Sequence, residues 1–142
     1  MAARKNAELA TRSFGRCLVR GDLFDRFYEV FLGSHPSIPP YFANTDFTVQ
    51  KQLLRHGINF ALMMAKGDSI ATQALSKIRS THSKSKLNIP PRLYGYWKNS
   101  FLQAVSEIDP KFGDEGLSDA WEEVLEETVE YVAGGYDLED DE

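Results

Sequence analysis

The chain has 142 residues, of which 42% are apolar and 26% charged, the proportions of a soluble globular protein with room for one core. We therefore expect a single domain over residues 1–142. A formal net charge of −5 argues against a nucleic-acid partner, and the lone Cys17 excludes an internal disulfide and a cysteine-based metal centre. No signal-peptide core and no apolar run of membrane-spanning length is visible, so we expect a cytoplasmic protein without a membrane partner.

Apolar residues in the first third of the chain recur with the period of an α-helix. We predict one helix over about Asn6–Val19 and a second that begins at Asp22, which can cap it. The second helix has an almost wholly aromatic face made of Phe24, Phe27, Tyr28 and Phe31. Gly33-Ser34-His35-Pro36 ends it, and the prolines that follow leave only a short turn of helix before Tyr41-Phe42.

The middle of the chain predicts two more helices. Asn44-Thr45-Asp46 marks the start of one that runs to about Lys66, with a stripe made of Phe47, Gln50, Leu54, Ile58 and Ala61. A second apolar stripe, made of Leu53, Phe60 and Met64, indicates that this helix is sandwiched between others. Gly67-Asp68-Ser69 interrupts the pattern, and the next helix is expected from near Ser69 to His82.

The last third of the chain again reads as helical. Pro90 or Pro91 fits the first turn of a helix that Asp109-Pro110 stops. Its buried stripe consists of Tyr94, Trp97, Phe101, Val105 and Ile108. Ser118 is expected to cap a final helix that Gly134-Gly135 ends, and the acidic tail 137–142 is expected to fray. No strand pattern of useful length appears, so we predict an all-α domain of six or seven helices.

His82 is the residue that most needs explaining. It continues the apolar stripe of Leu75 and Ile78 at the last turn of its helix, so its imidazole is expected to point into the core. Taken alone, an inward histidine is more often a hydrogen-bonded core residue than a ligand. Whether His82 is a core residue or a ligand, one of its ring nitrogens needs a hydrogen-bond acceptor. The Ile78 carbonyl, one turn back, is well placed for this, and the hydroxyls of Ser83 and Ser85 are alternatives.

Tyr28, Phe42, Gln50 and His82 occur in an order that resembles the globin family. The segments RFYEVFL and THSKSKLNIPPRLYGYW carry the resemblance most specifically, and they are similar to bacterial single-domain globins and to the haem domain of flavohaemoglobins. The resemblance implies the globin fold, a three-over-three helical sandwich around haem b, that is iron protoporphyrin IX.

The resemblance also implies roles for individual residues. His82 would be the proximal ligand of the iron, and Tyr28 and Gln50 would stabilise a gas ligand on the distal side. The further residues expected to contact the cofactor are Phe42, Leu54, Ile78, Ile89, Tyr94 and Phe101.

His56 is the alternative distal residue, because Arg55-His56-Gly57 resembles the distal segment of animal globins. Gln50 is preferred because it places the apolar Leu54 one turn further on, over the iron. If His56 were the distal residue, Phe60 would lie over the iron and crowd the ligand. If Gln52 were the distal residue, the polar His56 would lie over the iron.

Flavohaemoglobins pair the tyrosine that corresponds to Tyr94 with a glutamate late in the last helix. In this sequence the position of that glutamate falls near Tyr136, and Glu130 lies a turn or more before it. The sequence therefore does not predict a proximal histidine that donates electrons strongly to the iron. His35, beside a turn proline, is expected to face solvent. The basic residues Lys77, Arg79, Lys84, Lys86 and Arg92 are interpreted as a solvated surface; the alternatives are pairing with haem propionates or docking an acidic reductase.

The resemblance implies that the protein reversibly binds dioxygen and other diatomic gases, including nitric oxide and carbon monoxide, for storage, transport or scavenging. The alternatives are a nitric oxide dioxygenase working with a separate reductase, a gas-sensing haem domain, and a haem-free interaction domain. The sequence is compatible with a gas-binding protein and with an enzyme, a nitric oxide dioxygenase.

Overall fold

The computed structural model describes residues 2–137 and side chains from Arg4 onward. Within this range there is no β-strand, and the chain forms six α-helices and two short 3₁₀ turns, so the predicted all-α class is confirmed. The elements are α1 (Ala2–Arg20), α2 (Leu23–Leu32), η1 (Pro39–Phe42), α3 (Phe47–Ala65), α4 (Ser69–Thr81), η2 (Pro91–Leu93), α5 (Tyr94–Ile108) and α6 (Leu117–Ala133). The expectation for the acidic tail falls mainly on residues 138–142, which lie outside the described residues.

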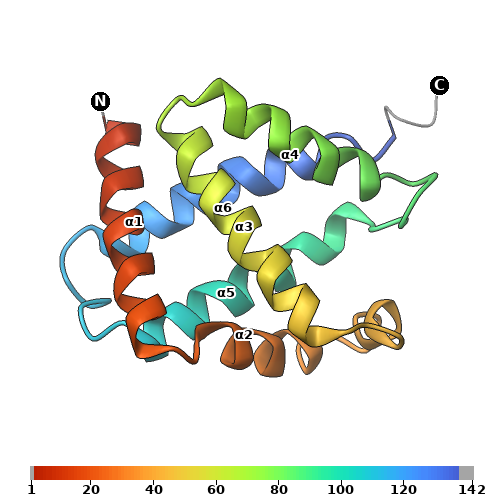
Figure 1. Ribbon diagram of the computed structural model, residues 1–142, viewed down its shortest axis with the longest axis horizontal. Helices are drawn as coiled ribbons and strands as arrows, with labels where there is room; N and C mark the ends of the chain where they lie inside the picture. The colour runs from red at the N-terminus through yellow and green to blue at the C-terminus, as the bar shows by residue number, and fades with distance from the viewer. Residues whose placement is uncertain (1, 138–142) are drawn as a thin grey trace.

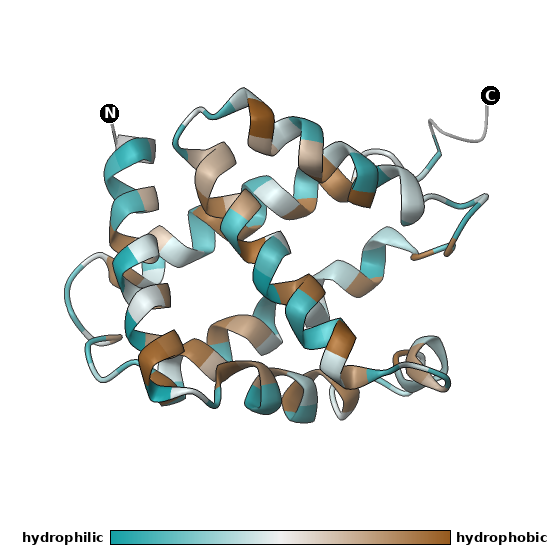
Figure 2. Cartoon of the chain, in the orientation of Figure 1, coloured by the Kyte–Doolittle hydropathy of each residue, from teal (hydrophilic) through white to brown (hydrophobic). Residues whose placement is uncertain are grey.

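The helices pack in pairs around one core. α1 packs against α6, α2 against α5 and α3 against α4, while α3 also contacts α1 and α6. Figure 1 shows α3 crossing the middle of the molecule, with α1 at one end of the long axis and the α4–α5 connection at the other. Each helix has a polar and an apolar side, visible as teal and brown patches in Figure 2. None of the helices in residues 2–137 is long and apolar enough to cross a membrane.

Aromatic rings connect the helices inside the core. Trp121 of α6 contacts Phe14 of α1 and Phe101 of α5, with ring centroids 6.3 and 5.4 Å apart. Phe101 in turn lies 5.7 Å from Phe27 of α2. The three contacts are edge-to-face or tilted, the geometry that aromatic pairs prefer, and the four rings are almost completely buried.

Two of the predicted helix starts are confirmed, and two predicted caps are wrong. The carboxylates of Asp46 and Asp68 each accept hydrogen bonds from two backbone N–H groups in the first turns of α3 and α4. Asp22 stands at the N-cap of α2 but its side chain makes no capping bond. Ser118 lies inside the first turn of α6, because the chain turns at Gly116 with φ +84° and the helix begins at the buried Leu117.

The expected second stripe of α3 is only partly correct. Phe60 and Met64 are half-buried, but Leu53 is 57% exposed. The helices that contact α3 leave the side that carries Leu53 open to solvent. The predicted Pro90–Pro91 start of α5 takes the form of the η2 turn, which Pro91 begins and which leads directly into Tyr94.

A buried carboxylate joins α1 to the turn after α5. Asp109 accepts two hydrogen bonds from the Arg16 guanidinium at 2.8 and 2.9 Å, one from the Ser13 hydroxyl at 2.6 Å, and one from the Lys111 backbone N–H at 3.0 Å. Ser13 in turn accepts a hydrogen bond from the indole of Trp121 at 2.9 Å. Burial alone would raise the pKa of Asp109, but the donors outweigh it and lower that pKa to about 2.

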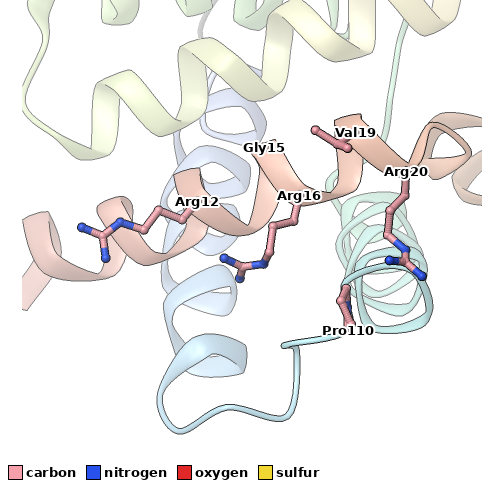
Figure 3. A pocket seen from close by; sticks show the side chains of 6 residues that line it. All are labelled: Arg12, Gly15, Arg16, Val19, Arg20 and Pro110. Atoms are coloured by element: carbon pink, nitrogen blue, oxygen red, sulfur yellow. The ribbon is translucent and has the colours of Figure 1, made fainter.

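A surface hollow lies beside this ion pair, between α1 and the turn that carries Pro110 (Figure 3). Arg16 and Arg20 reach from α1 on the side of Pro110, whereas Arg12 points away from it. Arg16, which lines the hollow, is paired with Asp109.

We expect Asp109→Asn to lower the free energy of unfolding by about 2 kcal/mol at neutral pH, since the carboxylate is stabilised by nearly two pKa units in the folded state. A depressed folded-state pKa stabilises the protein above the ordinary carboxyl pKa, and the contribution is lost as pH falls toward 2. Urea titration from pH 7 to pH 2 tests both statements. The exposed Glu115→Gln is the matched control, and equal stability of Asp109→Asn and the wild type would contradict the role given to the ion pair.

Candidate functional site

His82 stands at the C-cap of α4, where its ring is fixed by the carbonyl one turn earlier. The Ile78 carbonyl lies 2.8 Å from Nδ1 of His82 and also accepts the backbone N–H of His82 at 3.0 Å. The predicted Ile78 acceptor is therefore confirmed, and the Ser83 hydroxyl pairs with Ser85 instead. A carbonyl can only accept, so Nδ1 carries the proton and Nε2 keeps the free lone pair.

The surroundings of His82 favour a neutral imidazole. Burial lowers the pKa of His82, and the hydrogen bond to Ile78 opposes that effect without cancelling it. A neutral ring with an unprotonated Nε2 is the form in which histidine binds a metal.

The ring of Tyr94 lies beside His82, with centroids 6.5 Å apart. Tyr94 is buried, and burial raises the pKa of its hydroxyl. No acidic side chain hydrogen-bonds to that hydroxyl within the described part of the chain, and Glu130 is exposed. Tyr136 is engaged elsewhere, with its hydroxyl donating to the Asn88 side chain at 2.5 Å.

A second polar group is formed where α2 meets α3. Tyr28 is only 5% exposed, and burial raises its pKa to about 12, with hydrogen bonding to the Gln50 side chain opposing the increase. The ring of Tyr28 lies 5.9 Å from Phe42 of η1 and 5.4 Å from Phe47 of α3. The structure thus brings together three of the predicted residues, Tyr28, Phe42 and Gln50.

Phe47 is a member of this group that the sequence interpretation did not assign to the site. Its ring stacks on Phe42 with centroids 6.0 Å apart and completes an aromatic wall around Tyr28. The spacing in the sequence could have assigned Phe47 to this group, because Phe47 precedes Gln50 by three positions and lies on the same face of the helix.

The other predicted residues divide between the site and the core. Leu54 is buried one turn beyond Gln50 on α3, while His56 is exposed, which favours Gln50 over His56 as the inward-facing residue. Ile89 is half-buried and donates its backbone N–H to the His82 carbonyl at 3.2 Å. Phe101 packs among core aromatics, and a contact between Phe101 and a cofactor stays a prediction.

The expectation that His35 faces solvent is wrong. Its side chain is half-buried, and Nδ1 accepts the backbone N–H of Ser37 at 3.0 Å. The imidazole also lies 4.9 Å from the ring of Tyr96, so α5 covers part of it. His35 therefore acts as a local turn-stabilising residue.

The segment after His82 is held by a residue that the sequence interpretation missed. Asn88 has φ +54°, a left-handed conformation that asparagine tolerates better than most residues. Its N–H donates to the Ser83 carbonyl at 2.8 Å, and its own carbonyl accepts the Tyr41 hydroxyl at 3.0 Å. With the bond from Tyr136, three separate parts of the chain meet on Asn88.

No protein-family model matches this chain, and no curated protein does so either. Among solved structures, the chain is similar to the crystal structure of a Pseudomonas aeruginosa protein described as structurally highly homologous to a human haemoglobin. The two share 38% sequence identity and a TM-score of 0.87, over 92% of this chain and 98% of that one. The predicted fold is thereby confirmed, whereas the particular similarity to flavohaemoglobins stays a prediction. At this identity and coverage, the chain belongs to the globin family.

Proposed function

We propose that the protein holds haem b through Nε2 of His82 and reversibly binds dioxygen and other diatomic gases. The observation that carries the proposal is the His82 imidazole itself, fixed through Nδ1 by the Ile78 carbonyl and kept neutral by burial. The bond leaves Nε2 unprotonated, which a histidine that binds iron requires.

The remaining side chains fit the same group. Haem has two large apolar faces, and the aromatic residues Phe42, Phe47 and Tyr94 stand near the two polar clusters. Leu54 adds a buried aliphatic side chain on the helix that carries Gln50. When bound, haem supplies a ferrous iron that donates electron density to a diatomic gas.

Tyr28 and Gln50 give the gas site its polarity. With a pKa of about 12, Tyr28 keeps its proton at neutral pH and can donate a hydrogen bond to a ligand atom that gains negative charge. Such a bond contributes about 1.5–3 kcal/mol. This corresponds to about one to two decades in affinity, and it favours dioxygen over the less polar carbon monoxide.

The proximal side favours gas binding over oxidation. An acidic partner for Tyr94 would draw the Nδ1 proton more strongly and make His82 a stronger donor. Here the Nδ1 partner is a neutral carbonyl, and Tyr136 bonds to Asn88. We therefore favour storage, transport or scavenging over nitric oxide dioxygenation, which would also need an external reductase.

Replacing His82 tests the ligand assignment. The wild-type apoprotein should take up haemin and give a Soret band, and His82→Gly should bind it weakly or with altered iron ligation. Added imidazole should restore the wild-type spectrum by occupying the space of the lost ring. His56→Gly is the matched control, since His56 is exposed on α3. A folded wild-type protein that refuses haemin would contradict the proposal.

Replacing Tyr28 tests the gas-stabilising role. Tyr28→Phe should speed dioxygen release by about tenfold or more, because one charge-assisted hydrogen bond is lost. Carbon monoxide release should change less. Stopped-flow displacement measures both rates, with Tyr96→Phe as the control for loss of an exposed hydroxyl. An unchanged dioxygen release rate would show that another group holds the ligand.

A further inference from the structure

The outward side of α3 carries a stripe of apolar side chains that residues 2–137 leave open to solvent. Val49, Leu53 and Met63 are 49%, 57% and 38% exposed, and Phe60 is half-buried. The buried side of the same helix is made of other residues, namely Leu54, Ile58, Ala61 and Leu62. α3 therefore presents apolar side chains to solvent as well as to the core, and Figure 1 shows it in front of α5 and α6.

The spacing of the exposed stripe is that of a helix that packs along a second helix. With His56 included, successive members are four, three, four and three positions apart, which is a heptad pattern over two heptads. A helix on the outside of a globular protein needs only one apolar side. We name the five residues of this second apolar side the outer seam: Val49, Leu53, His56, Phe60 and Met63.

The outer seam is nearly symmetrical about His56. Val49 and Met63 lie seven positions before and after His56. Leu53 lies three positions before it and Phe60 four after it. When two copies of α3 cross antiparallel about a two-fold axis at His56, Val49 of each copy meets Met63 of the other. In the same crossing Leu53 meets Phe60, and a two-fold interface requires this reciprocity.

The polar residues beside the outer seam fit the same arrangement. Gln52 and Asn59 are exposed on one flank, four positions before and three positions after His56. An antiparallel crossing brings the Gln52 amide of one copy toward the Asn59 amide of the other, and amides complement each other because they both donate and accept.

The charge of this face also favours a second copy of the chain. α3 contains no acidic residue, and Arg55 is the only charged residue among the exposed residues of 48–63. The centres of protein interfaces are depleted in charge in the same way. A membrane surface fits less well, because helices that lie on membranes carry several lysines or arginines beside their apolar stripe.

We infer that the outer seam is the site at which two copies of this chain associate, with the two α3 helices antiparallel and His56 at the two-fold axis. The seam spans fourteen positions, about 21 Å of helix. A contact of this length is smaller than a standard interface of about 800 Å² per partner, so we expect a dissociation constant of about 10–100 μM. The association uses the outside of α3 and requires no haem, so its failure and that of the proposed function are distinguishable.

Sedimentation velocity at protein concentrations below and above this dissociation constant tests the association. We expect Leu53→Glu to weaken it by about tenfold or more, because the change places a carboxylate inside each half of the seam. His56→Leu should strengthen it, since a polar residue at a seam position costs stability. Val19→Glu is the matched control, because Val19 is 88% exposed on α1 and lies outside the seam.

Disulfide cross-linking with oxidised glutathione tests the antiparallel arrangement. The single native cysteine, Cys17, is completely buried, so an introduced thiol reacts alone. His56→Cys should give a cross-linked dimer, because the two-fold axis brings residue 56 to its own copy. Val49→Cys should not, since its two copies stand about 21 Å apart and a disulfide requires Cα atoms within about 7 Å. Val19→Cys gives the background rate.

A protein that stays monomeric at all concentrations would overturn the proposal. So would a dimer that persists in Leu53→Glu, with circular dichroism confirming that the variant is folded; Met63→Glu takes its place if it is not. Equal cross-linking of Val49→Cys and His56→Cys would overturn the antiparallel arrangement. Binding of the monomer to phosphatidylcholine vesicles that Leu53→Glu abolishes would overturn the proposal by assigning the seam to a membrane.

Discussion

The hydrogen bond between the Ile78 carbonyl and Nδ1 of His82 is the constraint on which the candidate site depends. It uses the carbonyl that closes the last turn of α4, so the end of the helix also selects the tautomer of the imidazole. The side chain is held by the same backbone group that holds its own N–H. The chemistry of His82 is thus a direct consequence of where α4 stops.

The polar cluster of Tyr28 and Gln50 is built on a different principle. Tyr28 and Gln50 belong to α2 and α3, and they meet because aromatic rings pack between these elements. Burial raises the pKa of the Tyr28 hydroxyl and hydrogen bonding to Gln50 opposes the increase, so packing and the polar partner act in opposite directions. The backbone fixes the imidazole of His82, whereas the packed core positions the hydroxyl of Tyr28.

Much of this could be predicted from sequence, because the signals are local. The helices follow from a 3.6-residue period, the Asp46 and Asp68 caps from their position before an apolar run, and the Ile78 acceptor from helical spacing. The predictions that failed concern features that tertiary packing decides. Gly116 displaced Ser118 as the start of α6, and Leu53 is exposed because no helix covers it. The Asn88 junction is invisible in sequence, since its partners Tyr41 and Tyr136 are remote.

The hydrogen bonds at Asn88 connect segments that are far apart in the sequence. Tyr41 directly precedes Phe42 in η1, so its hydrogen bond to the carbonyl of Asn88 ties the loop after His82 to the backbone that carries Phe42. The connection runs around the outside of the molecule, independent of the aromatic core. The Tyr41 hydroxyl therefore holds the segment that carries Phe42 and the segment that follows His82 at a fixed spacing on the surface.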